Sequence, residues 1–123
     1  MRPVWQAETA LGRGDCLRAC VASLLELGAD EVPNFRLADD QWGALQEWLA
    51  GRGLTAIRVR PDGLYPRINA HCIVTGDSPR NQSVLHAVVG RIEDDTISVV
   101  HDPHPENAGL GGPPQWLTFL GRT

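Results

Sequence analysis

The chain has 123 residues, of which 42% are hydrophobic and 21% charged, so it has enough apolar side chains for a folded core and lacks the composition of a disordered protein. Its net charge of -4 at pH 7 argues against nucleic acid as a partner, because binding to phosphates needs a basic surface. No stretch approaches the roughly 18 apolar residues of a membrane span, and the first residues lack an apolar signal core. We therefore expect one domain, residues 1–123, in the cytoplasm, without a membrane or nucleic-acid partner.

The first predicted element is a helix over 16–27, with Gly28 as its expected stop. Its apolar side chains recur at spacings of three and four residues, which is typical of a helix with one buried face. They are Leu17, Cys20, Val21, Leu24 and Leu27. The Asp15 side chain is expected to cap the free N–H groups at the start of this helix, which makes Cys16 the first helical residue.

A second helix is predicted over 41–50, after Asp40 and before Gly51. Strands are predicted in five segments that are rich in β-branched and apolar residues and are bounded by turn residues. They are 54–60, 70–75, 84–92, 96–100 and 115–120. The stretch 103–114 is rich in proline and glycine and is predicted to be a loop.

Helices followed by strands favour an α+β fold. We expect a helical part over about 1–53 and an antiparallel sheet over about 54–123. In this arrangement the N-terminal helices pack on the sheet, and the functional site lies in the cleft between them.

Cys16 is the strongest candidate for a reactive group. Backbone N–H groups at a helix start have no partner within the helix, and together with the helix dipole they favour a negatively charged thiolate. The thiolate is the nucleophilic form of cysteine. Cys20 and Cys72 lie inside apolar segments and are interpreted as core residues. Three cysteines, an odd number, do not suggest a disulfide framework.

His86 and Asp102 are predicted to meet across a hairpin. If the acidic turn 93–95 is centred on Asp94, both residues stand eight positions from the centre and face each other in an antiparallel pair. A two-residue turn would shift this register by one. Facing Cβ atoms lie roughly 4.5 to 5.5 Å apart, which allows the carboxylate to orient the imidazole. An oriented imidazole near Cys16 can accept the thiol proton and later protonate a leaving group.

These segments resemble the papain-like cysteine peptidases. The similarity lies in Asp15-Cys16 leading into a helix, in His86-Ala-Val-Val-Gly and in Val99-Val-His-Asp102-Pro103. Within that superfamily the chain is most similar to the bacteriocin-leader, double-glycine peptidase domains attached to some ABC exporters. The resemblance covers about the whole chain in order and size. It implies a papain-like fold with Cys16 as nucleophile, His86 as general base and acid, and Asp102 as the orienting residue.

The resemblance also implies a glutamine upstream of the nucleophile, whose amide donates to the oxyanion together with the N–H group of the cysteine. Gln6 is the one upstream candidate. It lies ten residues before Cys16, farther than is usual in these families, and the segment Leu11-Gly-Arg-Gly14 can absorb the difference. Leu17 replaces the glycine that commonly follows the nucleophile, so a narrower approach to the thiol is expected.

We therefore expect a cysteine hydrolase that cleaves an amide bond in a peptide or protein substrate through an acyl-enzyme intermediate. The expected catalytic residues are Cys16, His86 and Asp102, with Gln6 at the oxyanion and no metal or other cofactor. Deamidation and acyl transfer use the same machinery and stay open as alternatives. Nothing in the sequence specifies an oligomeric state.

Two other classes of function remain open. One is a catalytically inactive papain-like module whose cleft binds a peptide or protein partner. The other is a zinc-dependent hydrolase or zinc-stabilised domain, because His71, His101 and His104 add imidazoles to the three thiols. The spacings do not match those of a closed structural zinc site, apart from the loose pair His101 and His104.

Overall fold

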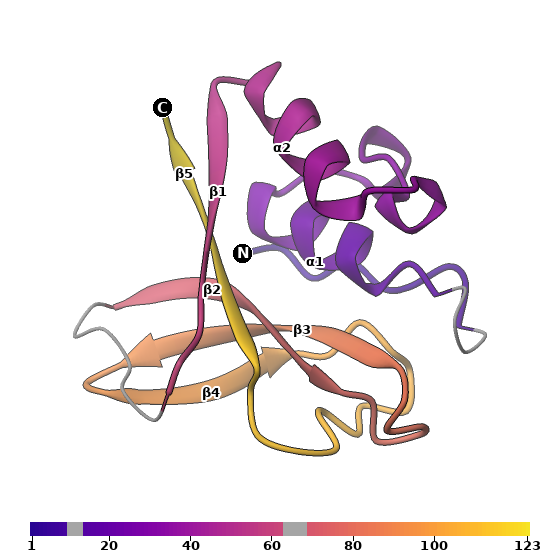
Figure 1. Ribbon diagram of the computed structural model, residues 1–123, viewed down its shortest axis with the longest axis vertical. Coiled ribbons are helices and arrows are strands. Elements are labelled where there is room, and N and C mark those ends of the chain that lie inside the picture. Colours follow the sequence, from indigo (N-terminus) through magenta and orange to yellow (C-terminus); the bar gives the residue numbers. More distant parts are fainter. Residues whose placement is uncertain (10–13, 63–68) are drawn as a thin grey trace.

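The computed structural model describes residues 1–9, 14–62 and 69–123. Within these ranges two α-helices lie on one side of a five-stranded antiparallel sheet, so the predicted α+β class is confirmed (Figure 1). The elements in chain order are α1 (Cys16–Leu25), the 3-10 helices η1 (Ala29–Glu31) and η2 (Phe35–Leu37), α2 (Gln41–Ala50), β1 (Leu54–Val59), β2 (Ala70–Asp77), β3 (Leu85–Glu93), β4 (Thr96–His101) and β5 (Trp116–Arg122). No helix in the described part of the chain has the length and apolar character needed to cross a membrane.

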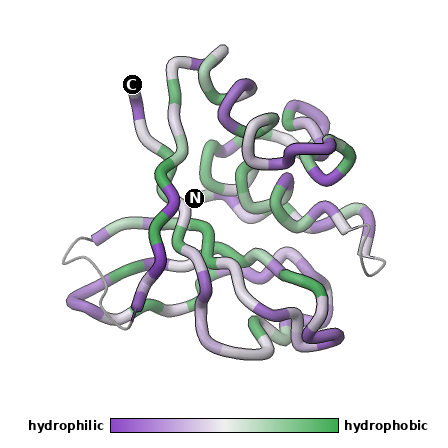
Figure 2. The backbone as a smooth tube through the Cα atoms, in the orientation of Figure 1, coloured by the Kyte–Doolittle hydropathy of each residue, from purple (hydrophilic) through white to green (hydrophobic). Residues whose placement is uncertain are grey.

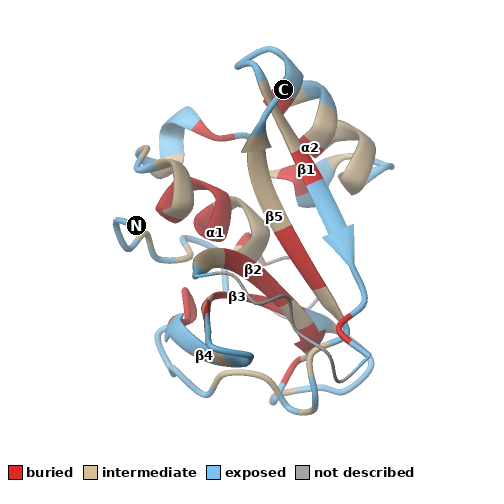
Figure 3. Cartoon of the chain, turned by 90° about the vertical axis from the view of Figure 1, so that its left-hand side faces the viewer, coloured by how far each residue is buried: buried red, intermediate tan, exposed pale blue. Residues whose placement is uncertain are grey.

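The strands follow the order β1-β5-β2-β3-β4 across the sheet. The last strand, β5, lies between β1 and β2 and pairs with both, so the C-terminal residues join the two halves of the sheet (Figure 1). The edge strands β1 and β4 are mostly exposed, whereas β2, β3 and part of β5 are buried (Figure 3). The segment 103–114 contains no helix or strand, as predicted for a loop.

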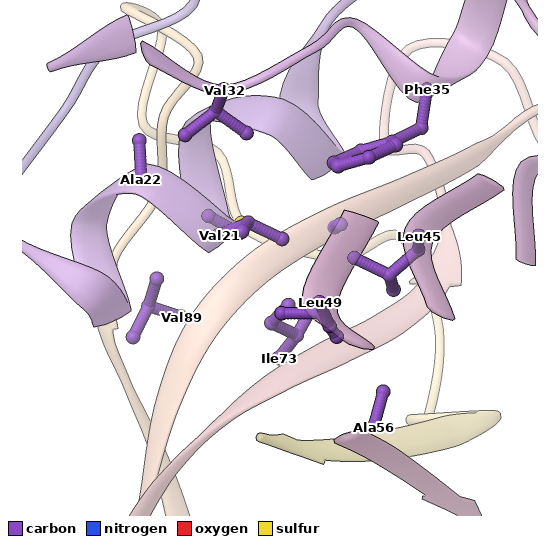
Figure 4. Close-up of a cluster of buried hydrophobic side chains, with 11 residues drawn as sticks. Val21, Ala22, Val32, Phe35, Leu45, Leu49, Ala56, Ile73 and Val89 are labelled. Atoms are coloured by element: carbon purple, nitrogen blue, oxygen red, sulfur yellow. The ribbon is translucent and has the colours of Figure 1, made fainter. Parts of the chain in front are cut away.

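The main core fills the space between the helices and the sheet (Figure 4). α1 packs against β3 and β2, and its most buried stretch, 19–23, consists of small residues apart from Val21. Small side chains let the helix approach the sheet closely. Around it lie Val32, Phe35, Leu45, Leu49, Ala56, Ile73 and Val89 (Figure 4). Hydrophobic residues gather in α1 and along the strands, and the connecting loops carry most of the hydrophilic ones (Figure 2).

A second cluster of buried side chains covers the other face of the central strands. Its members are Cys72, Val74, Val88, Ile92 and Leu117, with Ile97, Leu110 and Phe119 packed against them. Successive residues of a strand point to opposite faces, so Ile73 enters the first cluster while Cys72 and Val74 enter the second. Cys20 and Cys72 are both fully buried, which confirms their interpretation as core residues.

Two features of α1 differ from the prediction. The helix ends at Leu25 instead of Leu27, because Glu26 adopts the left-handed conformation (φ 58°) that was expected of Gly28. The Leu27 N–H group then donates to the Ala22 carbonyl and closes the last turn. At the other end, the Asp15 side chain makes no capping hydrogen bond, so the predicted cap is wrong.

The predicted register of the β3–β4 hairpin is also wrong. Asp94 and Asp95 both have positive φ, 48° and 68°, and form a two-residue turn. Glu93 therefore faces Thr96. A bulge between Val89 and Gly90 shifts the register again, and the last pair is Val89 with His101. His86 and Asp102 both lie beyond this last pair and do not face each other in the ladder.

The core position of Leu49 provides a test of the fold. Its side chain is 0% exposed, whereas Leu37 is 82% exposed. We expect Leu49→Ala to lower the free energy of unfolding by about 2–5 kcal/mol, because it removes buried methyl groups and leaves a cavity. Leu37→Ala serves as the control and should change it by less than about 0.5 kcal/mol. Urea unfolding measures both values, and equal effects would contradict the assigned core.

Candidate active site

Asp102 and His86 form a hydrogen bond in spite of the shifted register. His86 Nε2 lies 2.8 Å from Asp102 Oδ1, and the two residues are 4% and 1% exposed. The carboxylate also accepts from the backbone N–H groups of His104 (3.0 Å, to Oδ1) and Gly109 (2.8 Å, to Oδ2). Three donors therefore fix the carboxylate, and a carboxylate only accepts, so Nε2 carries a proton. The loop that follows β4 brings Asp102 to the imidazole that β3 provides.

Cys16 lies close to the same imidazole, and both residues line one cavity. It is the first residue of α1 and is half-buried. The interaction with Cys16 raises the pKa of His86, so the two side chains are close, and since Nε2 is used by Asp102, Nδ1 is the nitrogen left for the sulfur. The structure thus brings together all three residues that the sequence analysis named as a triad, in the order Asp102, His86, Cys16.

The surroundings of His86 favour its charged form. Burial lowers the pKa of His86, but the hydrogen bond to Asp102 and the interaction with Cys16 outweigh burial and raise it to about 9. Burial likewise raises the pKa of Asp102, and the hydrogen bonds from His86 and from the backbone of His104 and Gly109 outweigh it and lower the pKa below its ordinary value. At neutral pH His86 is therefore an imidazolium between a carboxylate and the Cys16 sulfur.

The other two cysteines, Cys20 and Cys72, are buried thiols with a raised pKa. Burial raises the pKa of Cys20 well above the ordinary value for a thiol, and burial raises that of Cys72 to about 12. Both are therefore neutral thiols, closed to solvent, across the physiological range. Cys16 is the cysteine that reaches solvent.

Gln6 lies at the same cavity as Cys16 and His86. Its backbone N–H group donates to the Pro103 carbonyl at 2.9 Å, next to Asp102. Its side-chain Nε2 donates to the Glu8 carbonyl at 3.0 Å, and Oε1 is buried with no hydrogen-bond partner among the described residues. The structure therefore brings Gln6 to the site, with its amide donor turned to Glu8. Nε2 has two N–H groups, and this contact uses one of them.

Asp15 holds the segment that carries Gln6, a role that the sequence did not indicate. Its carboxylate is 2% exposed and accepts from the N–H groups of Ala7 and Glu8, each at 3.1 Å. These donors replace the helix N–H groups that the predicted cap would have used. The residue directly before Cys16 is thus tied to the residues directly after Gln6. The N-terminal segment has no local signal that places it beside Asp15.

Ser23 and His101 fix the same N-terminal segment farther upstream. The Val4 N–H group donates to Ser23 Oγ at 2.9 Å, and the Val4 carbonyl accepts from His101 Nε2 at 2.7 Å. The Arg2 N–H group donates to the Ser23 carbonyl at 2.9 Å. His101, a candidate metal ligand from the sequence, therefore uses its side chain to bind the backbone of the N-terminal segment.

The metal alternative rests on residues that have other partners in the structure. In the ranges 1–9, 14–62 and 69–123, no group of three or more His, Cys, Asp or Glu side chains could hold a metal ion. His104 Nδ1 accepts from the Glu106 N–H group at 3.1 Å. The His104 ring lies 6.3 Å from the ring of His86, between centroids.

A cavity of about 290 Å³ opens at Cys16 and His86. The apolar and aromatic part of the cavity wall includes Leu17, Trp42 and Trp116. The loop after β2 adds Ser78 and Arg80 to the lining. Leu17, the residue after Cys16, therefore lines the same cavity as the thiol. The size suits a few residues of an extended chain or a small acyl group.

The role of Asp15 can be tested by hydrogen exchange. Asp15→Ala removes the acceptor for the Ala7 and Glu8 amides, so we expect faster exchange at both and a loss of about 1.5–3 kcal/mol in the free energy of unfolding. Asp40→Ala is the matched control, because Asp40 is an exposed aspartate that accepts from one backbone amide, that of Gly43. Unchanged exchange at Ala7 and Glu8 in the Asp15 variant would contradict the assigned contacts.

The high pKa of His86 predicts a specific pH dependence of stability. The ordinary pKa of 6.5 applies to the unfolded chain, and the value in the fold is about 9, so protonated His86 stabilises the fold. This contribution is fully present below pH 6.5 and is lost as the pH rises through about 9. Urea unfolding between pH 6 and pH 9.5 should show this loss in the wild type and lack it in His86→Gln. Parallel pH profiles would refute the raised pKa.

Comparisons of the chain with protein-family models, with curated proteins and with solved structures find no match. Support for a function therefore comes from the arrangement of the site. That arrangement is a half-buried cysteine at a helix start, beside a histidine that a buried carboxylate holds.

Proposed function

We propose that this chain is a papain-like cysteine hydrolase that cleaves an amide bond in a peptide or protein substrate. The observation that carries the proposal is that Asp102 holds His86 through a 2.8 Å hydrogen bond, while His86 and Cys16 interact and line the same cavity. A nucleophile, a base that reaches it and a third group that orients the base are the parts of a nucleophilic triad. The N-terminus of α1 against the sheet that carries the histidine also supports the papain-like assignment of the fold.

Acylation uses Cys16 and His86. The Cys16 sulfur attacks the carbonyl carbon of the substrate, and the carbonyl oxygen becomes an oxyanion. His86 then gives its Nδ1 proton to the leaving amine, the C–N bond breaks, and a thioester to Cys16 remains. Asp102 stays ionised and keeps Nε2 protonated, so that Nδ1 is the nitrogen that exchanges the proton.

The oxyanion is held at the start of α1. The Cys16 N–H group is at the first helical position, where helix geometry provides no internal acceptor. It donates to the oxyanion, and the Gln6 amide adds a second donor through the N–H group that the Glu8 carbonyl does not use. In deacylation His86 takes a proton from water, the hydroxyl attacks the thioester, and Cys16 leaves. An amine in place of water gives acyl transfer, and a glutamine side chain as substrate gives deamidation.

One observation favours a second candidate, a papain-like module that binds a peptide without cleaving it. One N–H group of the Gln6 amide is engaged by the Glu8 carbonyl at 3.0 Å. If the other N–H group does not reach the substrate, the oxyanion has the Cys16 N–H group alone. Such a cavity still recognises an extended peptide.

The rate of alkylation by iodoacetamide at each cysteine tests the proposed nucleophile. We expect rapid labelling of Cys16 at pH 6 if it is the nucleophile of the triad, and much slower labelling in His86→Ala. Cys20 and Cys72 are internal controls, since both are buried and neutral at this pH. Mass spectrometry of the digested protein gives all three rates in one reaction.

A chromogenic acetyl ester extends the same test to catalysis. A hydrolase should release one equivalent of chromophore in a burst and retain an acetyl group on Cys16, and Asp102→Asn should slow the burst. Fast alkylation without acylation would support the binding module. Cys16 labelling that is slow at pH 6 and indifferent to His86 would exclude the triad.

A further inference from the structure

The cavity beside Cys16 is basic although the protein is acidic. The chain has 15 acidic and 11 basic residues, yet the cavity is lined by three arginines, Arg36, Arg58 and Arg80, and by no Asp or Glu in the described ranges. The remaining segments, 10–13 and 63–68, contain no acidic residue either. The described lining therefore contributes positive charge and no carboxylate. Such a concentration of one charge in a cavity attracts the opposite charge.

Arg58 is the arginine that is most clearly arranged for a ligand. Its guanidinium carbon lies 4.4 Å from the ring centroid of Trp42, in α2, and 4.6 Å from that of Trp116, in β5. Both rings line the cavity. Two aromatic contacts restrict the motion of the side chain and leave its planar edge as the place for hydrogen bonds. Within the described chain, no ion pair or hydrogen bond uses the guanidinium N–H groups of Arg58.

Arg80 adds to the same field. Its Nη1 lies 3.7 Å from Glu106 Oε2, but the Glu106 side chain is 60% exposed and lies outside the cavity lining. Nη1 is itself buried and has no hydrogen-bond partner among the described residues. An exposed carboxylate at this distance compensates the charge only weakly.

We propose that Arg58, between Trp42 and Trp116, binds a carboxylate of the substrate while the scissile carbonyl lies at Cys16. The inference rests on the proposed function, since it places this subsite in the same cavity as the nucleophile. A carboxylate matches the planar guanidinium with two parallel hydrogen bonds, which a neutral amide cannot do. The substrate is thus an acidic peptide, whose carboxylate comes from a Glu or Asp side chain or from a free C-terminus.

Four peptides separate the two sources of the carboxylate. They are acetyl-Ala-Ala-Glu-Ala and acetyl-Ala-Ala-Gln-Ala, each with a free or an amidated C-terminus. Binding is measured by the tryptophan fluorescence of the Cys16→Ser protein, which cannot turn the peptides over. We expect at least one carboxylate to strengthen binding by roughly tenfold over the doubly neutral peptide. The amidated Glu peptide carries only the side-chain carboxylate, and the Gln peptide with a free C-terminus carries only the terminal one. Comparing these two shows which carboxylate is bound.

Two substitutions assign the effect to Arg58. Arg58→Gln should abolish the preference for the carboxylate. Arg52→Gln is the matched control and should preserve it, because Arg52 also lies over a tryptophan, Trp48, at 4.7 Å, but does not line the cavity. Equal affinity for all four peptides, or an unchanged preference in Arg58→Gln, would overturn the proposed subsite.

The test keeps the two proposals apart. Binding to the Cys16→Ser protein does not require catalysis, so a carboxylate preference that depends on Arg58 supports the subsite even if the wild type forms no acyl-enzyme. Conversely, an acyl-enzyme at Cys16 without any carboxylate preference would retain the hydrolase and reject the subsite.

Discussion

The site depends first on the Asp102 carboxylate, which is buried and accepts three hydrogen bonds. Two of them come from the backbone of the loop that contains Asp102, so the carboxylate is fixed whether or not the imidazole is present. Such preorganisation matters because an ionised carboxylate in the interior needs partners for its charge. The remaining donor is His86, whose ring then has one orientation and presents Nδ1 to Cys16.

Four separate parts of the chain have to meet at this point. α1 brings Cys16, β3 brings His86, the loop after β4 brings Asp102, and the N-terminal segment brings Gln6. Close packing of small α1 residues on β3 sets the first two against each other. The N-terminal segment is held through polar contacts instead, by the side chains of Asp15, Ser23 and His101 and by the Pro103 carbonyl. The same part of the fold that stabilises this segment therefore also assembles the site.

Local patterns in the sequence predict much of this arrangement. Contacts between residues that are distant in sequence leave no such pattern. The start of α1 at Cys16 and the position of every strand follow from short patterns of apolar and turn residues. The meeting of His86 and Asp102 was inferred from a symmetric hairpin, but the Asp94-Asp95 turn and the bulge at Gly90 give another register, and a loop makes the contact instead. The insertion of β5 between β1 and β2 and the Asp15 contacts join residues distant in sequence, and no local pattern indicates either.

The charge state of His86 is the most direct test of the account, because every proposed step requires an imidazole held by Asp102. Nuclear magnetic resonance of the ring, titrated with pH, measures it at the atom concerned. The account predicts that His86 keeps both ring protons until about pH 9 in the wild type and titrates at a lower pH in Asp102→Asn. A wild-type His86 that loses its proton near pH 6.5, with no change in the Asp102 variant, would contradict it.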